Sequence, residues 1–147
     1  MKTKTHAAAG AVALLTILIF WTSTVGVELF GSHEAVASVK SAILRGMIIL
    51  VPAMAIVGAT GMSLGRKRRD RLTRAKKTRM PLIAANGLLV LVPSAFFLAG
   101  RAEAGLFDAW FYGIQALELV AGAANIAMMG LNIRDGLRMT RRIRRAA

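Results

Sequence analysis

The sequence contains no cysteine, only two histidines and only seven acidic residues among 147. Without cysteine the chain has no disulfides, thiolate metal ligands, iron–sulfur ligands or cysteine nucleophiles. His6 and His33 alone are too few for the usual multi-histidine metal or haem centre within one chain. A glycine-rich phosphate loop, paired carboxylates in a common motif and a Ser/His/Asp arrangement at recognisable spacing are also missing. The sequence therefore predicts a protein that is not an enzyme.

The chain is instead rich in two kinds of residue: 56% are hydrophobic, and 20 Lys and Arg give a formal net charge of +13. A soluble domain of this length buries only about two-thirds of its surface, so it would expose apolar patches that soluble monomers avoid. The basic residues fall in blocks between long apolar runs, without the aromatic interleaving that is typical of nucleic-acid binders. We therefore expect an integral membrane protein with no nucleic-acid partner.

Four apolar stretches are long enough to cross the hydrocarbon layer of a bilayer, which takes about 20 residues of helix. They cover approximately residues 7–30, 41–64, 81–100 and 106–131. Backbone amides in hydrocarbon must be satisfied internally, which favours helices. The first stretch is longer than the apolar region of a signal peptide, so we expect it to remain as a helix. The sequence predicts an all-α integral membrane four-helix bundle that forms a single transmembrane domain over residues 1–147.

The basic residues also predict the orientation of these helices. Two lysines precede the first helix, nine basic residues lie in the loop 66–79, and six arginines follow the fourth helix, so 17 of the 20 lie on one side. The opposite side carries two short connections with Glu34, Glu103 and Asp108. Positive residues mark the cytoplasmic side. We expect an antiparallel up-down bundle in the bacterial inner (plasma) membrane, crossing it several times, with both termini in the cytoplasm.

The basic loop and the basic tail suit contact with anionic lipid headgroups. The loop 66–79 contains no glycine or proline, which permits a solvated extension of the second helix, and Pro81 is well placed to begin the third. The tail 133–147 mixes apolar residues with arginines, as in an amphipathic segment on a membrane surface, where each basic residue contributes about 1 kcal/mol. The residues expected to hold anionic lipid are Arg66, Lys67, Arg68, Arg69, Arg141, Arg142, Arg144 and Arg145.

The fourth helix carries an ionisable residue, Glu118, in the middle of its apolar stretch. Polar and small residues at spacings of three and four share its face, because this spacing follows the helical repeat. They are Tyr112, Gln115, Glu118, Gly122, Asn125 and Met129. Lipid cannot satisfy a polar face, so it points into the bundle or towards a partner. We interpret Tyr112, Gln115, Glu118 and Asn125 as a ligand or partner face. The alternative is structural: a neutral Glu118 donates to Asn86, Thr22 or Ser23.

Two further charges lie inside the apolar stretches, and histidine and acidic residues lie in the outer connections. Glu28 is near the end of the first helix and Arg45 about one turn into the second, so a short connection places them at similar depth. The sequence predicts an intramembrane ion pair of Arg45 with Glu28 or Asp108 that clamps helices together, with a substrate site as the alternative. His33 and its acidic neighbours suit a solvated loop better than a weak divalent-metal site.

The segment HAAAGAVALLTILIFWTSTVGVELF, residues 6–30, resembles the first helix of small bacterial membrane proteins in which a histidine precedes a glycine-containing span. These include b-type cytochromes and the membrane helices of PepSY-type proteins. The whole chain loosely resembles small uncharacterised four-helix bacterial inner-membrane proteins. The cytochrome resemblance implies haem b with His6 as an axial ligand. The later helices offer no second histidine, so Met128, Met129 or a second copy's His6 would complete the site.

Three functions are compatible with these features. The first is a non-enzymatic inner-membrane protein without a cofactor, which binds a lipid-soluble ligand or a membrane partner, a second copy included, through the polar face. The second is a proton-coupled small-molecule transporter in which Glu118 alternates between protonated and cation-bound forms. In size and helix count the chain resembles small multidrug transporters, but their essential glutamate lies mid-span in the first helix, whereas Glu28 lies near the outer boundary. The third is electron transfer through haem b.

Overall fold

The computed structural model describes residues 2–66 and 70–146, with side chains for residues 3–66 and 70–140. Every element within these residues is a helix. Four helical segments are long and apolar enough to cross a membrane: Thr3–Phe30, His33–Gly65, Arg71–Glu103 and Ala109–Thr140. For the described residues, the prediction of an all-helical chain with four helical segments long and apolar enough to span a membrane is confirmed.

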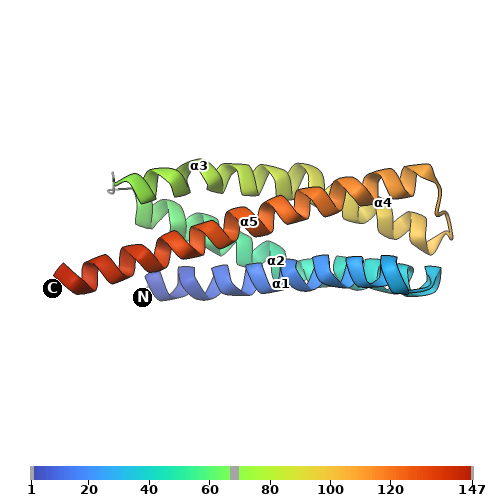
Figure 1. Ribbon diagram of the computed structural model, residues 1–147, viewed down its shortest axis with the longest axis horizontal. Helices are drawn as coiled ribbons and strands as arrows, with labels where there is room; N and C mark the ends of the chain where they lie inside the picture. The colour runs from blue at the N-terminus through green and yellow to red at the C-terminus, as the bar shows by residue number, and fades with distance from the viewer. Residues whose placement is uncertain (1, 67–69, 147) are drawn as a thin grey trace.

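The helices are arranged with both ends of the chain at one end of the molecule (Figure 1). In chain order they are α1 (Lys2–Phe30), α2 (His33–Gly65), α3 (Arg71–Asn86), the π-helical η1 (Gly87–Leu91), α4 (Val92–Glu103) and α5 (Ala109–Ala146). The start of α3 lies at the same end as the termini, whereas the two short connections lie at the opposite end. We call these the terminal end and the connection end.

The second helix begins earlier than expected, at His33 and not at residue 41. Ser32 is its N-cap, and the Ser32 hydroxyl accepts a hydrogen bond of 3.3 Å from the backbone N–H of Ala35. Such a cap satisfies an amide that has no partner within the helix. The earlier start places Lys40 inside α2, on the same buried face as Val36 and Ile43.

From Arg71 onwards, the basic segment 66–79 belongs to the third helix and not to an extension of the second. Helix α3 begins at Arg71, because the Asp70 carboxylate caps it. This carboxylate accepts from the backbone N–H of Thr73 at 3.0 Å and from the Thr73 hydroxyl at 2.7 Å. Pro81 therefore lies inside α3 and does not begin it. The tail likewise continues α5 as far as Ala146.

A wide helical turn separates α3 from α4. Pro93 has no backbone N–H to donate, and the N–H of Val92 bonds to the carbonyl of Gly87, five residues back, as in a π-helix. Just before this turn, the Asn86 side chain donates to Asn125 Oδ1 at 2.9 Å and to the Ala121 carbonyl at 2.8 Å. These hydrogen bonds join α3 to α5 near the middle of the molecule.

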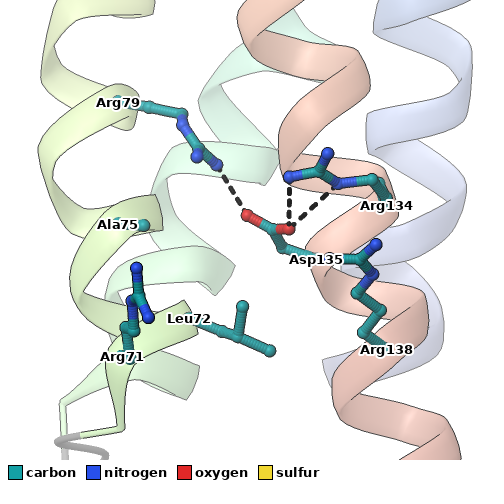
Figure 2. Close-up of a pocket in the computed structure, with 7 residues that line it drawn as sticks. All are labelled: Arg71, Leu72, Ala75, Arg79, Arg134, Asp135 and Arg138. Carbon is teal, nitrogen blue, oxygen red and sulfur yellow. Dashed lines mark hydrogen bonds and ion pairs between the residues drawn. The ribbon is translucent and has the colours of Figure 1, made fainter.

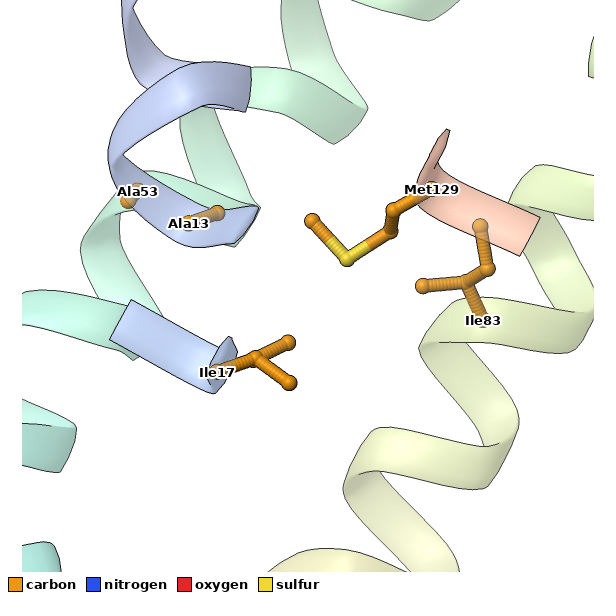
Figure 3. Packing of buried hydrophobic residues seen from close by; sticks show 5 residues of the cluster. All are labelled: Ala13, Ile17, Ala53, Ile83 and Met129. Carbon is orange, nitrogen blue, oxygen red and sulfur yellow. The ribbon is translucent and has the colours of Figure 1, made fainter. Parts of the chain in front are cut away.

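The helices pack through two apolar clusters. Side chains of Ala13, Ile17, Ala53, Ile83 and Met129 come from four different helices and meet in the first cluster (Figure 3). The second cluster, nearer the connection end, consists of Val36, Leu98, Ala102 and Phe111. Helix α1 packs along α2 and also contacts α5, while α2 contacts α4 and α3 contacts α5.

Glycine allows two of these helix contacts to be close. A Cβ atom added at Gly46 of α2 would lie 2.5 Å from Cζ of Phe20 in α1. One added at Gly122 of α5 would lie 3.0 Å from Cδ1 of Trp21. The Trp21 indole N–H donates to the Leu119 carbonyl at 2.9 Å. Small residues therefore bring α1 against both α2 and α5, as is common for helices in membranes.

The outward surfaces of the helices are strongly apolar. Ile48, Leu89 and Val120 lie on three different helical segments and each has more than 70% of its surface exposed. Apolar exposure on this scale is unfavourable in water. It is the expected surface of helices that lie in lipid.

Candidate functional site

The polar face of α5 points into the molecule. Gln115, Asn125 and Met129 are buried, and Glu118 has a side chain that is 13% exposed. Tyr112 does not belong to this face, because it is 46% exposed while its neighbour Phe111 is fully buried. The side chain of Phe111 takes the inward position one turn before Gln115. The sequence allows this face to point into the bundle or towards a partner, and in the structure it points inward.

Glu118 is bonded to Lys40, which comes from α2. The Lys40 ammonium lies 2.5 Å from Glu118 Oε2, and Gln115 Nε2 donates to the same oxygen at 3.4 Å. Lys40 is only 1% exposed, so this ion pair is buried. Two of the residues expected to accept a hydrogen bond from Glu118 bond to other partners: the Asn86 amide donates to Asn125 Oδ1, and the Thr22 hydroxyl donates to the Leu18 carbonyl.

Lys40 is not among the site residues predicted from the sequence, because it precedes the second apolar stretch, which begins near residue 41. Residues close to Lys40 in the sequence do indicate the earlier helix start. Ser32 is a favourable N-cap, and Glu34 suits the first turn of a helix. Val36, Lys40 and Ile43 then follow at spacings of four and three. Extending the helix back to residue 33 would have placed Lys40 on its inward face.

Two acceptor oxygens in the same region have no hydrogen-bond donor. Glu28 Oε1 and Gln115 Oε1 are buried and lack a partner in the part of the chain that the structure describes. Glu28, on α1, interacts electrostatically with Lys40, His33 and Glu118. We call Glu28, Lys40, Gln115 and Glu118 the acidic cluster, since it combines two carboxyl groups with one ammonium group. It lies within about three turns of the connection end.

The ion pair predicted for Arg45 is not formed among the described residues. Arg45 is exposed on α2, whereas Asp108 is paired with Arg101 and its other oxygen accepts from the Phe111 N–H at 3.1 Å. The reason is the rotation of α2. Arg45 follows Lys40 by five residues, which corresponds to about 140° around a helix. Because Lys40 faces inward, Arg45 faces outward.

The two histidines lie at opposite ends of the molecule. The Nδ1 atom of His6 is 2.9 Å from the Thr60 hydroxyl, in a contact between α1 and α2. His33 stacks on Phe107 with ring centroids 4.0 Å apart. Among residues 2–66 and 70–146, no group of three or more His, Cys, Asp or Glu is placed to hold a metal ion. Haem ligation by His6 stays a prediction from the resemblance.

Most of the residues expected to hold anionic lipid lie outside the described part. Arg66 is described and exposed, one residue after the end of α2. The predictions for Lys67, Arg68 and Arg69, and for the side chains of Arg141, Arg142, Arg144 and Arg145, lie outside the described residues. Of the eight predicted lipid-binding residues, Arg66 is therefore the one whose side chain the structure describes.

The chain was compared with protein-family models, curated proteins and solved structures, and none of the three comparisons found a match. An inference about function consequently depends on the chemistry of the residues themselves. Within the apolar segments, the acidic cluster combines a buried ion pair with two buried acceptor oxygens that have no donor among the described residues.

Proposed function

We propose that the protein is a non-enzymatic membrane protein that binds a lipid-soluble ligand at the acidic cluster. We also propose that the four helices form an antiparallel bundle in the bacterial inner membrane, with both termini in the cytoplasm. Two observations support this orientation: both chain ends lie at the terminal end (Figure 1), and most basic residues belong to segments at that end. The inward direction of the polar face favours a ligand over a partner protein.

The observation that carries the proposal is the pair of buried acceptors without donors, Glu28 Oε1 and Gln115 Oε1. Leaving a buried polar atom unpaired costs about 1–3 kcal/mol. A ligand with a hydrogen-bond donor would remove this cost. With both carboxyl groups ionised, the acidic cluster has one negative charge in excess, so a donor that is also positive fits best. The proposed ligand class is a lipid-soluble molecule with a protonated amine.

Titration of the detergent-purified protein with decylamine tests this proposal. Trp21 reports on the site because its indole bonds to the Leu119 carbonyl beside Glu118, and a Trp110→Phe background removes the other tryptophan. We expect a saturable change in Trp21 fluorescence and about tenfold weaker binding by Glu28→Gln, since a hydrogen bond to a charged group contributes about 1.5–3 kcal/mol.

Glu34→Gln is the matched control, because it makes the same chemical change at an exposed position in the first turn of α2. Decanol, which has the same chain length without the positive charge, controls for partition into the micelle. Equal weakening by both substitutions, or equal binding of decylamine and decanol, would contradict the proposal.

Proton-coupled transport is the second candidate, and the sharing of one lysine by two carboxyl groups favours it. A proton or a cation can then bind in place of the other, as coupled exchange requires. The same protein in liposomes, loaded with a pH-sensitive dye and given gradients of several lipophilic cations, would then move protons. Absence of proton movement in liposomes, together with saturable decylamine binding, would leave ligand binding as the function and reject transport.

A further inference from the structure

A second polar site lies at the terminal end, between α3 and α5. It is a pocket of about 440 Å³ (Figure 2). Four of its residues are arginines, two from each helix. The lining consists of Arg71, Leu72, Ala75, Arg79, Arg134, Asp135 and Arg138. The pocket is separate from the acidic cluster, which lies near the connection end.

The arginines of the pocket are only partly neutralised. Asp135 is 1% exposed and accepts from Arg79 at 2.7 Å and from Arg134 at 3.2 Å. Figure 2 shows its carboxylate between these two guanidinium groups. The side chains of Arg71 and Arg138 have neither a hydrogen bond nor an ion pair with any residue that the structure describes. The pocket therefore has three positive charges in excess.

This arrangement suits a phosphate group. A guanidinium group presents its N–H donors in a planar fork that matches two oxygens of a phosphate, so arginine is well suited to bind this anion. Asp135 holds Arg79 and Arg134 in place, while Arg71 and Arg138 have their donors available. Leu72 and Ala75 supply an apolar wall beside the charged groups.

The position of the pocket along the helices also suits phosphate. Arg79 directly precedes the apolar part of α3, and Arg134 follows Ile133 near the end of the apolar part of α5. Headgroups occupy a layer of roughly 5–7 Å outside the hydrocarbon, and a helix rises 1.5 Å per residue. The pocket thus begins at the depth of lipid phosphates and opens towards the aqueous side.

We propose that this pocket binds a phosphate group, carried by a lipid headgroup or by a soluble phosphate ester, with Arg71 and Arg138 as its principal ligands. Binding joins α3 to α5 at the terminal end and adds to the ion pairs of Asp135. The site differs from general attraction of basic segments to anionic lipid, because it depends on particular arginines around one cavity.

Native mass spectrometry of the full chain in a neutral detergent, titrated with phosphatidylglycerol, tests the proposal. We expect Arg71→Gln/Arg138→Gln to weaken binding of the first lipid at least tenfold. The control is Lys4→Gln/Arg74→Gln, which removes two exposed basic residues of the terminal end outside the pocket. It should weaken binding less than threefold. Equal weakening by both double variants, or weakening by neither, would overturn the proposal.

A competition distinguishes the two sources of phosphate. If millimolar inorganic phosphate fails to displace phosphatidylglycerol, and phosphatidylcholine binds poorly, the source is a lipid headgroup. If inorganic phosphate displaces the lipid, the source is a soluble phosphate ester. Both results support a phosphate site.

Because Arg71 and Arg138 are exposed and unpaired, the double variant should fold. If it does not, Arg71→Gln and Arg138→Gln separately should each weaken binding about threefold, and unchanged binding by both would overturn the proposal.

Discussion

At the scale of single residues, the most consequential feature is the buried ion pair of Lys40 and Glu118. Removing two charges from water is costly, and their attraction repays this only if the geometry is good. The pair lies between α2 and α5, which are 78 positions apart in sequence at these residues. It therefore links two helices that do not pack directly against each other among the described residues, and its two members depend on each other.

We expect Lys40→Met to destabilise the protein by about 3–5 kcal/mol, because it leaves Glu118 buried without its cationic partner. Unfolding by SDS in mixed micelles, followed by tryptophan fluorescence, measures this change. The double variant Lys40→Met/Glu118→Gln should recover most of the loss, since it removes both charges.

Arg45→Met is the matched control for Lys40→Met. It removes a cation from the same helix at an exposed position and should change stability by no more than about 0.5 kcal/mol. A large loss from Arg45→Met would support the ion pair of Arg45 with Glu28 or Asp108 that the sequence alone predicts, and would contradict the exposed position of Arg45.

At the scale of elements, short capping interactions decide where the helices begin. Asp70 caps α3, and this cap assigns the basic segment from Arg71 onwards to the third helix. Two hydrogen bonds lower the pKa of Asp70 below its ordinary value of 3.8. The bond from the Thr73 hydroxyl has the larger effect, and the bond from the Thr73 backbone N–H has the next largest. The lowered pKa means that the folded state favours the ionised carboxylate, which stabilises the helix start.

The cap of α3 should therefore depend on pH. Because the pKa of Asp70 is lowered on folding, its contribution is present above its ordinary pKa and is lost as the pH falls through the lower, folded value. We expect amide hydrogen-exchange protection at residues 71–75 to decrease as the pH falls below 3.8, the ordinary pKa of the Asp70 carboxyl. Asp70→Asn, which can accept a hydrogen bond but does not titrate, should remove the part of this decrease that Asp70 causes. The same decrease in both proteins would show that other groups cause it.

At the scale of the whole molecule, the charges and the two candidate sites are separated along its length. The acidic cluster lies near the connection end, and the arginine pocket lies at the terminal end together with both chain ends (Figure 1). In the proposed orientation the arginines meet the anionic cytoplasmic leaflet, where basic residues are favoured. The acidic cluster then lies towards the opposite face of the membrane.

This orientation can be tested with introduced cysteines, because the chain has none of its own. In intact inner-membrane vesicles of known sidedness, Glu34→Cys should react with a membrane-impermeant maleimide only from the periplasmic side. Thr140→Cys should react only from the cytoplasmic side. Both positions are exposed in the structure. Labelling of both positions from one side would contradict the antiparallel arrangement with both termini in the cytoplasm.

Much of the helical organisation follows from residues that are close in sequence. Apolar runs of sufficient length predict four helical spans, and the spacing of Gln115, Glu118 and Asn125 predicts one polar face. Helix starts were less well predicted, because the caps at Ser32 and Asp70 lie in segments where composition suggests a loop. Tyr112 lies outside the inward face, because a spacing of three residues before Gln115 leaves it at the margin, and Phe111 takes the inward position.

The sequence by itself therefore determined the helical class, the number of spans and the strong asymmetry of charge, since hydropathy and charge are summed over neighbouring residues. Only the tertiary structure decided which charges meet: Lys40 with Glu118, Arg101 with Asp108, and Arg79 with Asp135. These pairs depend on the rotation of each helix about its axis and on how neighbouring helices pack. A rotation of one helix by about 100°, the angle between successive residues, leaves composition and hydropathy intact but changes which charged side chains face each other.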